Sequence, residues 1–246
     1  MCGRYTLTSP LEALSDLFGI SERPNLAASY NIAPTQMVAT IRIDNDGSRQ
    51  FSRLIWGLVP SWAKEVAKSG PFINARGETV DSKPSFRDAF RKRRCLIPAD
   101  GFYEWKREKP GAPKQPYRIT LAEEGLFAFA GIWERWEYPK AMESVVPALE
   151  TCAIVTTLAA PSIGHIHHRM PVILDDADHA TWLTASLDES LALIRPYEGG
   201  LAAHTVSTRV NAVRNDDAEL LIPITTGDIF EESRDSQPDG SQFDLF

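Results

Sequence analysis

Cys2 is the residue with the most distinctive chemistry in this 246-residue sequence. If Met1 is removed, Cys2 becomes the N-terminus and carries a thiol and a free α-amine on adjacent carbons. Ordinary pKa values are about 8.5 for the thiol and about 7.7–8.0 for the amine, so part of the amine is unprotonated near neutral pH. An aldehyde can form an imine with this amine, and the thiol can then close on the imine carbon to give a thiazolidine ring. The pair could instead attack an acyl carbon, with the amine as base. The alternative is that Cys2 is an ordinary residue near a frayed terminus.

Glu104 and His167 are candidates for proton transfer. Glu104 lies in the segment GFYEW, where alternation in a strand places it on the same face as Phe102. If Phe102 faces the core, Glu104 is a buried acid with a raised pKa; otherwise it faces solvent. His167 has His165 and His168 as neighbours, and on its own such a cluster is more often a polar loop with incidental histidines than an acid, base or ligand. His167 also lies just before an apolar strand, which is a good place for a positioned group.

Asn74 and Arg76 alternate in a short strand and so share a face. An amide and a guanidinium on one face suit an anionic ligand, although Arg76 could instead form a salt bridge with Glu78. Trp62 lies in the segment PSWAK, which we interpret as an exposed loop. Stacking of a nucleic-acid base on such a ring contributes roughly 1–3 kcal/mol.

Many short strands with a few helices are expected to position these residues. The patterns predict a strand that follows a turn at 33–34 and runs through Ile43 to a hairpin turn at 44–47, and a short strand within 72–79 that leads into a loop or helix start. Further strands are predicted over 50–56, 95–105 with a turn at 98–101, 117–121, 126–133, 151–157, 172–174 and 201–206. Helices are expected over 9–18 with Ser9 as N-cap, 85–93, 177–183 and 187–195, and 106–116 as a charged, proline-rich excursion. The fold class is therefore α+β, a single domain on a curved, mostly antiparallel, barrel-like sheet core flanked by short helices.

Composition limits the possible environments. Three cysteines (Cys2, Cys95 and Cys152) without a CxxC pair favour free thiols in a reducing cytoplasm over disulfides or a structural zinc site. We expect no secretory signal, membrane span, metal or cofactor. We expect a cytoplasmic, monomeric protein, associated with the nucleoid when it is bound to DNA.

Charge is distributed unevenly along the chain. The net charge of −7 argues against binding nucleic acid through a broad basic face. Residues 87–94, RDAFRKRR, are nevertheless strongly basic. We expect a single domain over 1–229, followed by an acidic, disordered tail over 230–246.

Six blocks in order give the chain a specific resemblance: CGRY, YNIAPT, WGLVPSW, NARGET, GFYEW and HHRMP, followed by 206–211. Together they resemble the SRAP family, the SOS-response-associated peptidase domain, over residues 2 to about 223.

The resemblance implies a sensor and shield of abasic sites in single-stranded DNA, part of DNA-damage repair in the SOS response. Processed Cys2 would form a thiazolidine crosslink with the ring-opened sugar, and Cys2 would also remove Met1 by autoproteolysis, so that peptidase and lyase-type activities are implied. Asn74 would hold the sugar or the terminus, Glu104 would shuttle protons and His167 would assist ring opening and reversal. Trp62 would wedge against a base.

An acidic protein is expected to bind DNA through a confined basic groove. The resemblance places Arg4 and Arg76 on phosphates, and we predict that Arg169 and some of the arginines in 87–94 also line the groove.

Two other classes of function remain open from the sequence. An N-terminal-nucleophile glutamine amidotransferase can also begin Met-Cys-Gly, although the required Arg-Gly and Asn-Gly elements are not recognised here. A non-catalytic single-stranded-DNA-binding module, with Cys2 incidental, is the other.

Overall fold

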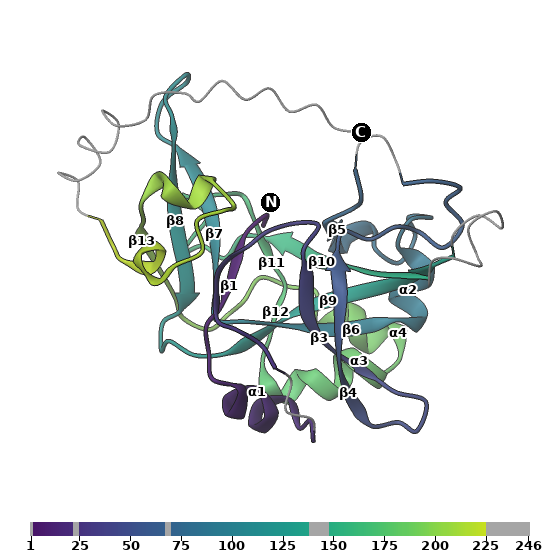
Figure 1. Cartoon of the computed structure of the whole chain (residues 1–246). Helices are drawn as coiled ribbons and strands as arrows, with labels where there is room; N and C mark the ends of the chain where they lie inside the picture. Colours follow the sequence, from purple (N-terminus) through teal and green to yellow (C-terminus); the bar gives the residue numbers. More distant parts are fainter. Residues whose placement is uncertain (1, 22–24, 67–69, 138–147, 225–246) are drawn as a thin grey trace.

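Five strands form a closed ring at the centre of the molecule (Figure 1). They are β3 (Met37–Ile43), β4 (Arg49–Trp56), β6 (Arg94–Ala99), β9 (Phe127–Trp136) and β10 (Leu149–Leu158). β3 pairs with β4 and β6, β6 pairs with β9, and β9 pairs with β10, all antiparallel. The parallel pairing of β10 with β4 completes the ring.

The computed structural model describes residues 2–21, 25–66, 70–137 and 148–224. The expected boundary at 229 and the acidic tail over 230–246 lie outside these ranges. In the described ranges, no helix is long and apolar enough to cross a membrane.

Three short strands extend the ring on the side where the candidate residues lie. β5 (Asn74–Arg76) runs parallel to β10, and β11 (Arg169–Pro171) pairs antiparallel with the end of β10. β12 (Ile173–Leu174) pairs with β9. β10 therefore pairs with both β5, which contains Asn74, and β11, which contains Arg169.

A second sheet packs beside the ring, in the order β13-β8-β7-β1-β2. Its strands are β13 (Leu201–Thr205), β8 (Lys114–Leu121), β7 (Gly101–Arg107), β1 (Tyr5–Leu7) and β2 (Ser29–Ile32). β1 lies inside the sheet, because it pairs antiparallel with both β2 and β7. The beginning of the described chain is thus held on two sides.

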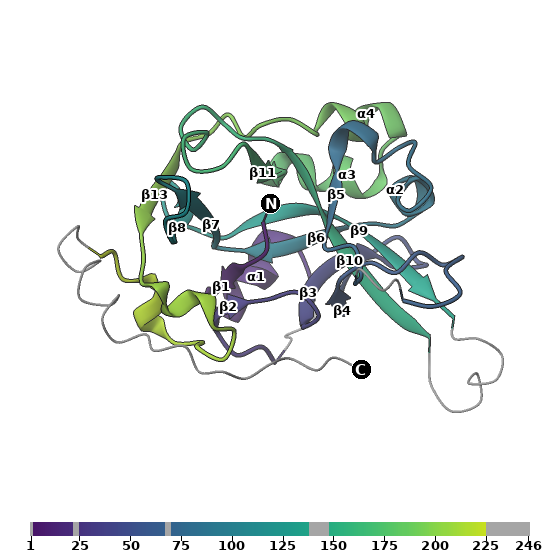
Figure 2. The ribbon, with the colours of Figure 1, turned by 90° about the horizontal axis from the view of Figure 1, so that it is seen from above.

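Short helices cover the lower and right-hand parts of the ring, as the two views show (Figures 1 and 2). They are α1 (Leu11–Phe18), α2 (Arg87–Lys92), α3 (His179–Thr184) and α4 (Leu187–Ala192). Four 3-10 turns complete the fold: η1 (Gly77–Thr79), η2 (Asp176–Asp178), η3 (Thr208–Asn211) and η4 (Ala218–Leu221).

The core fills the space between the ring, the second sheet and the helices. Tyr5 makes edge-to-face contacts with Trp56 and Phe129, which joins the two sheets. A smaller apolar cluster on the other face of the second sheet contains Tyr103 and three residues from the end of the described chain, Val206, Val210 and Leu220. Burial of large aromatic side chains on both faces stabilises the sheet that carries Glu104.

The structure confirms the α+β class and the curved, barrel-like, mostly antiparallel core. It differs from the predictions locally. The strand predicted over 95–105 has no four-residue turn at 98–101, since β6 continues through Pro98 to Ala99 and β7 begins at Gly101. The 106–116 excursion is the tip of a β7–β8 hairpin. Ser9 is not the N-cap of α1, because its backbone N–H and hydroxyl both donate to Asp100.

Candidate active site

The register of β1 brings the N-terminal segment to Glu104. Tyr5 pairs with Phe102, and the backbone N–H of Tyr103 donates to the carbonyl of Arg4 at 3.0 Å. Continuing this antiparallel register places Gly3 opposite Glu104. Strand pairing, and not a flexible loop, therefore sets the distance between Cys2 and the acid.

Cys2 is buried, with its side chain in the core and its carbonyl bound by Asn74. The side-chain amide of Asn74 donates to the Cys2 carbonyl oxygen at 2.8 Å. Burial, reinforced by the negative charge of Glu104, raises the pKa of the Cys2 thiol well above its ordinary value. The thiol is thus neutral here and needs a base before it can act as a nucleophile. The other amide atom, Asn74 Oδ1, is buried and has no hydrogen-bond partner among the described residues.

Glu104 is a buried acid, as the alternation with Phe102 predicted. Its residue is only 2% exposed, and burial raises the pKa of its carboxyl above the ordinary range. Its Oε1 lies 3.8 Å from Nδ1 of His167. A carboxyl whose pKa is raised by burial holds its proton to a higher pH than an ordinary Glu, which suits a general acid or base.

His167 stands at the mouth of the site, with its side chain 20% exposed. Its Nδ1 lies 3.0 Å from the carbonyl oxygen and 3.1 Å from the backbone nitrogen of Arg169, which fix the ring. The ring also stacks on His168, with centroids 4.5 Å apart. Burial lowers the pKa of His167, so the imidazole is neutral at pH 7.

Asp100 fastens the other end of β1. Its carboxylate accepts hydrogen bonds from the Thr6 hydroxyl and from the backbone N–H groups of Thr8 and Ser9. Carboxylates that accept several such bonds hold chain segments firmly. The sequence interpretation did not include Asp100, although an acid directly before Gly101 at a strand boundary is a signal for such a role.

The block YNIAPT binds the end of the described chain to the second sheet. The Asn31 amide donates to the carbonyls of Val210, Ala212 and Asn215. Asp216 in turn accepts from the backbone of Asn31. Residues almost two hundred positions apart are thereby fixed beside the N-terminus.

The same block contains the one non-glycine residue with a left-handed backbone in the described ranges. Thr35 has φ = 72°, and its N–H donates to the carbonyl of Trp56 at 2.8 Å. Gly57 follows with φ = 145°, and a Cβ there would lie 2.7 Å from the ring of Pro71. A β-branched residue at positive φ is costly, so the blocks YNIAPT and WGLVPSW fix one strained junction.

Arg169 does not lie on the DNA-facing surface that we predicted for it. Its side chain is buried and forms two parallel bonds to the Glu78 carboxylate, at 2.8 and 2.9 Å, and one to the Thr156 carbonyl. The prediction that Arg169 lines a DNA-binding groove is corrected to a structural role, since its guanidinium donors are used inside the protein. The partner of Glu78 is thus Arg169 and not Arg76.

Arg76 and Trp62 are exposed, and Arg4 is half-buried. Arg76 forms no ion pair with any described residue. Trp62 is 62% exposed and lies at the rim of an apolar pocket of about 190 Å³, which Pro60 and Phe72 also line. Arg4 donates at 3.4 Å to the Asn211 carbonyl. Arg76 and the ring of Trp62 are therefore accessible from solvent, whereas Arg4 is partly engaged with the backbone.

The basic run over 87–94 serves the fold in part. Arg94 is buried and donates to the carbonyls of Phe90, Trp182 and Ala185. Arg93 pairs with the buried Glu134 at 2.8 Å. Arg87 and Arg91 remain exposed on α2.

The described residues contain no group of three or more His, Cys, Asp or Glu side chains arranged to hold a metal ion. The site instead joins Cys2, an amide, an acid with a raised pKa and a neutral imidazole. This set is that of a cysteine site with two groups beside it that can carry a proton.

The chain belongs to the SOS response associated peptidase (SRAP) family, whose model matches residues 1–213. Abasic site processing protein YoqW of Bacillus subtilis (strain 168) is 42% identical over 229 residues, which is 90% of this chain and 99% of that protein. Abasic site processing protein HMCES of Gallus gallus is 41% identical over 214 residues, which is 76% of this chain and 62% of that protein.

A solved structure has the same fold. A protein from Bacteroides thetaiotaomicron superimposes with a TM-score of 0.79 at 25% identity, covering 91% of this chain and all of that one.

Proposed function

We propose that this protein processes abasic sites in single-stranded DNA by forming a covalent thiazolidine crosslink through Cys2. The placement of Cys2 carries the proposal, since its carbonyl is bound by Asn74 and the register of β1 brings it to Glu104. The similarity to proteins named for abasic site processing supports it.

The reaction needs removal of Met1, because only then does Cys2 have a free α-amine. The amine condenses with the C1′ aldehyde of the ring-opened sugar, and one water leaves as the imine forms. The thiol then adds to the imine carbon, its proton passing to the ring nitrogen, and closes the thiazolidine. The crosslink thus consumes one amine, one thiol and one aldehyde and releases one water.

Glu104 is suited to move protons in both steps. The carbinolamine that precedes the imine must lose water, which requires an acid near the former aldehyde oxygen. The buried thiol must lose its proton when it attacks, which requires a base. A carboxyl with a raised pKa serves both needs in turn, and His167, 3.8 Å away, is placed to exchange a proton with it and with solvent.

Removal of Met1 is proposed to be autoproteolytic, with Cys2 acting on its own preceding peptide bond and Glu104 as the neighbouring acid. DNA is proposed to approach over the exposed side chains in front of the site. Arg4 and Arg76 contact phosphates and the Trp62 ring stacks on a base beside the lesion, whereas Arg169 holds the site together from inside.

The experiment uses a single-stranded oligonucleotide whose one uracil has been converted to an abasic site by uracil glycosylase. Wild-type protein is expected to give a band that survives denaturing electrophoresis, with a mass equal to protein lacking Met1 plus DNA minus one water. A tetrahydrofuran analogue of the abasic site, which has no aldehyde, gives no band. A duplex with the same lesion tests the single-strand preference.

Three variants separate the chemical steps. Cys2→Ala, treated with an aminopeptidase so that Met1 is removed without the thiol, keeps the α-amine on residue 2 and lacks the thiol. Any adduct of this variant is an imine that survives only after borohydride reduction. A non-removable N-terminal extension blocks the amine but keeps the thiol, and is expected to abolish the crosslink; the same extension at the C-terminus is the control. A stable, unreduced adduct with Cys2→Ala or with the N-terminal extension would refute the thiazolidine mechanism.

A further inference from the structure

The tip of the β7–β8 hairpin is a basic element in an acidic protein. Residues 106–114 carry four cations, Lys106, Arg107, Lys109 and Lys114, and one acid, Glu108, whereas the whole chain has a net charge of −7. Glu108 forms an ion pair with Lys106, whose Nζ lies 2.9 Å from Glu108 Oε1. Three cations of the hairpin are therefore not compensated within it.

Arg107 and Lys114 lie directly opposite each other in the antiparallel register. Both are exposed, and neither forms an ion pair with a residue in the described ranges. Like charges placed opposite each other across two strands destabilise the pairing. Such an arrangement is favourable when an anion binds between the two cations.

The hairpin extends directly from the candidate active site. Glu104 lies three residues before Arg107 on β7, which corresponds to about 10 Å along a strand. The positive charge of Lys114 is close enough to oppose in part the rise that burial causes in the pKa of Glu104, and to add to the lowering that burial causes in the pKa of His167. Strand alternation puts Arg107 and Lys114 on the face of β7 that carries Tyr103 and Trp105, so these two cations border the site at the end of the hairpin and do not line it beside Glu104.

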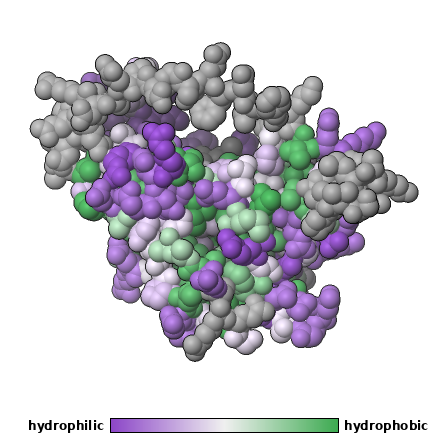
Figure 3. Space-filling view, viewed as in Figure 1, coloured by the Kyte–Doolittle hydropathy of each residue, from purple (hydrophilic) through white to green (hydrophobic). Residues whose placement is uncertain are grey.

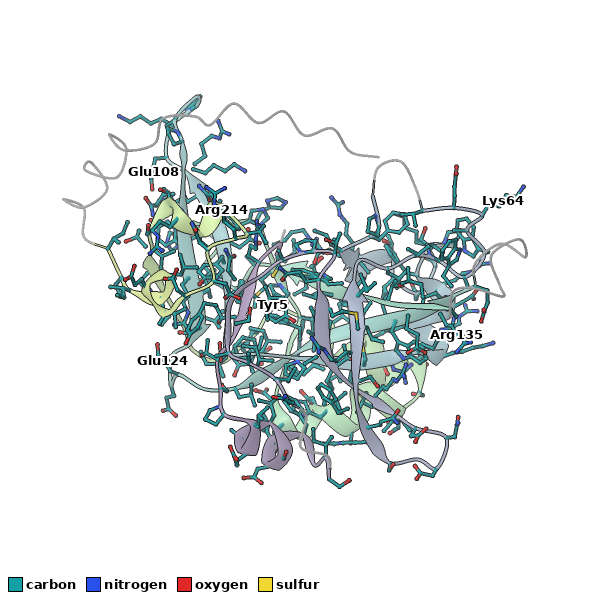
Figure 4. All side chains as sticks on the ribbon, in the orientation of Figure 1. Tyr5, Lys64, Glu108, Glu124, Arg135 and Arg214 are labelled. Atoms are coloured by element: carbon teal, nitrogen blue, oxygen red, sulfur yellow. The ribbon has the colours of Figure 1, made fainter. Side chains whose placement is uncertain are left out.

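The figures place this hairpin on one side of the N-terminal segment. In Figure 4, Glu108 and Arg214 lie at the upper left and Lys64, from the loop of Trp62, lies at the upper right. Figure 3 shows hydrophilic residues gathered at the upper left of this face, over the second sheet. A strand of DNA that passes the N-terminal segment from the Trp62 loop would next meet the hairpin.

We propose that Arg107 and Lys114 form a phosphate-binding clamp for the DNA strand, on the opposite side of the reacting nucleotide from Trp62. The inference rests on the proposed function, because it takes the strand to run through the Cys2 site. The bound phosphates belong to nucleotides next to the reacting sugar, because Arg107 lies only about 10 Å along β7 from Glu104.

The test measures binding without chemistry. The ligand is a fluorescent single-stranded oligonucleotide with a central tetrahydrofuran site, and its affinity is followed by anisotropy from 0.05 to 0.4 M salt for wild type and the double variant Arg107→Gln/Lys114→Gln. Each lost phosphate contact lowers the slope of log affinity against log salt by about 0.7. The expected loss of slope is thus about 1.4, with binding about 25-fold weaker at 0.1 M salt.

The matched control removes the same charge elsewhere. Arg53→Gln/Arg135→Gln also lowers the net charge by two, at exposed positions on β4 and β9 that line a different hollow. This control is expected to leave the slope unchanged. Melting temperatures check folding, and Arg107→Gln is expected to melt at or above wild type because a like-charge contact is removed.

The outcomes separate the two proposals. An unchanged slope in the folded hairpin variant, or an equal fall in the control, overturns the clamp. Failure of wild type to crosslink aldehyde-bearing DNA overturns the proposed function instead, and the slope measurement then still decides whether the hairpin binds phosphates.

Discussion

Replacing Glu104 by Gln is the most informative single change, because it should slow the reaction and stabilise the protein at once. Gln keeps the shape of the side chain but cannot transfer a proton. General acid–base catalysis contributes about 10²–10⁴-fold, so the rate of crosslinking at saturating DNA is expected to fall by that factor. The fall should be largest where wild-type Glu104 titrates.

The stability effect follows from the direction of the pKa shift. Burial raises the pKa of Glu104 above its ordinary value of 4.5, so the folded protein prefers the neutral acid. This preference stabilises the fold below the unfolded value and is lost as pH rises through the folded value. Each pKa unit of elevation corresponds to about 1.4 kcal/mol, and 1 kcal/mol changes the melting temperature by about 2–4 °C in a chain of this size. The advantage of Glu104→Gln over wild type therefore grows from about pH 4.5 upward.

Two measurements test the prediction. Single-turnover crosslinking to abasic single-stranded DNA is followed from pH 5.5 to 9, and melting temperature is recorded over the same range. Glu134→Gln is the matched control, since Glu134 is equally buried but pairs with Arg93; it should lose stability and keep its crosslinking rate. A Glu104→Gln protein that crosslinks as fast as wild type at every pH would refute the proton-transfer role.

Four further substitutions separate positioning, binding and pH effects. Asn74→Ala removes the bond to the terminal cysteine carbonyl, so it should cost about 1 kcal/mol in thermal unfolding and slow crosslinking even at saturating DNA. Arg169→Ala breaks the charged bonds to Glu78 and should cost about 1.5–3 kcal/mol, whereas Arg76→Ala should weaken binding of tetrahydrofuran-containing DNA without changing the melting temperature. Burial lowers the pKa of His179, so stability falls as pH drops through about 6.5; His179→Phe should reduce that fall in melts between pH 7 and 5.

Periodicity predicted most elements of the fold, because single strands and helices are local properties of the chain. The strands over 50–56 and 74–76 and the helices after Pro10 and Ser186 follow from alternation, apolar faces and turn residues. The ring closure was not predictable in this way. It depends on the pairing of β10 with β4, almost one hundred residues apart, and that pairing leaves no local pattern.

The candidate site likewise has features that follow from a single strand and features that depend on the pairing of distant strands. The burial of Glu104 followed from its shared face with Phe102, a property of one strand. The ion-pair partner of Glu78 could not be predicted in this way. Arg76 is close to Glu78 in sequence, but the pairing of β11 with β10 brings Arg169 to Glu78 instead. The position of Asp100 directly before Gly101 is a local signal, but its partners Thr6, Thr8 and Ser9 are more than ninety residues away in sequence and could not be predicted from it.

Chain termini are ordinarily poorly ordered, yet the proposed reaction needs a terminus placed to within a fraction of an ångström. The fold meets this need by inserting β1 between β2 and β7 and by binding its two ends, through Asn74 at Cys2 and through Asp100 beyond Leu7. The reacting groups thereby rest on paired strands, while the residues proposed to meet DNA lie on an exposed loop and an exposed hairpin tip. Substitutions at the paired strands should therefore change the rate at saturating DNA, and substitutions at the loop and the hairpin tip should change affinity. A hairpin variant that slowed the saturated reaction and left affinity intact would contradict this separation.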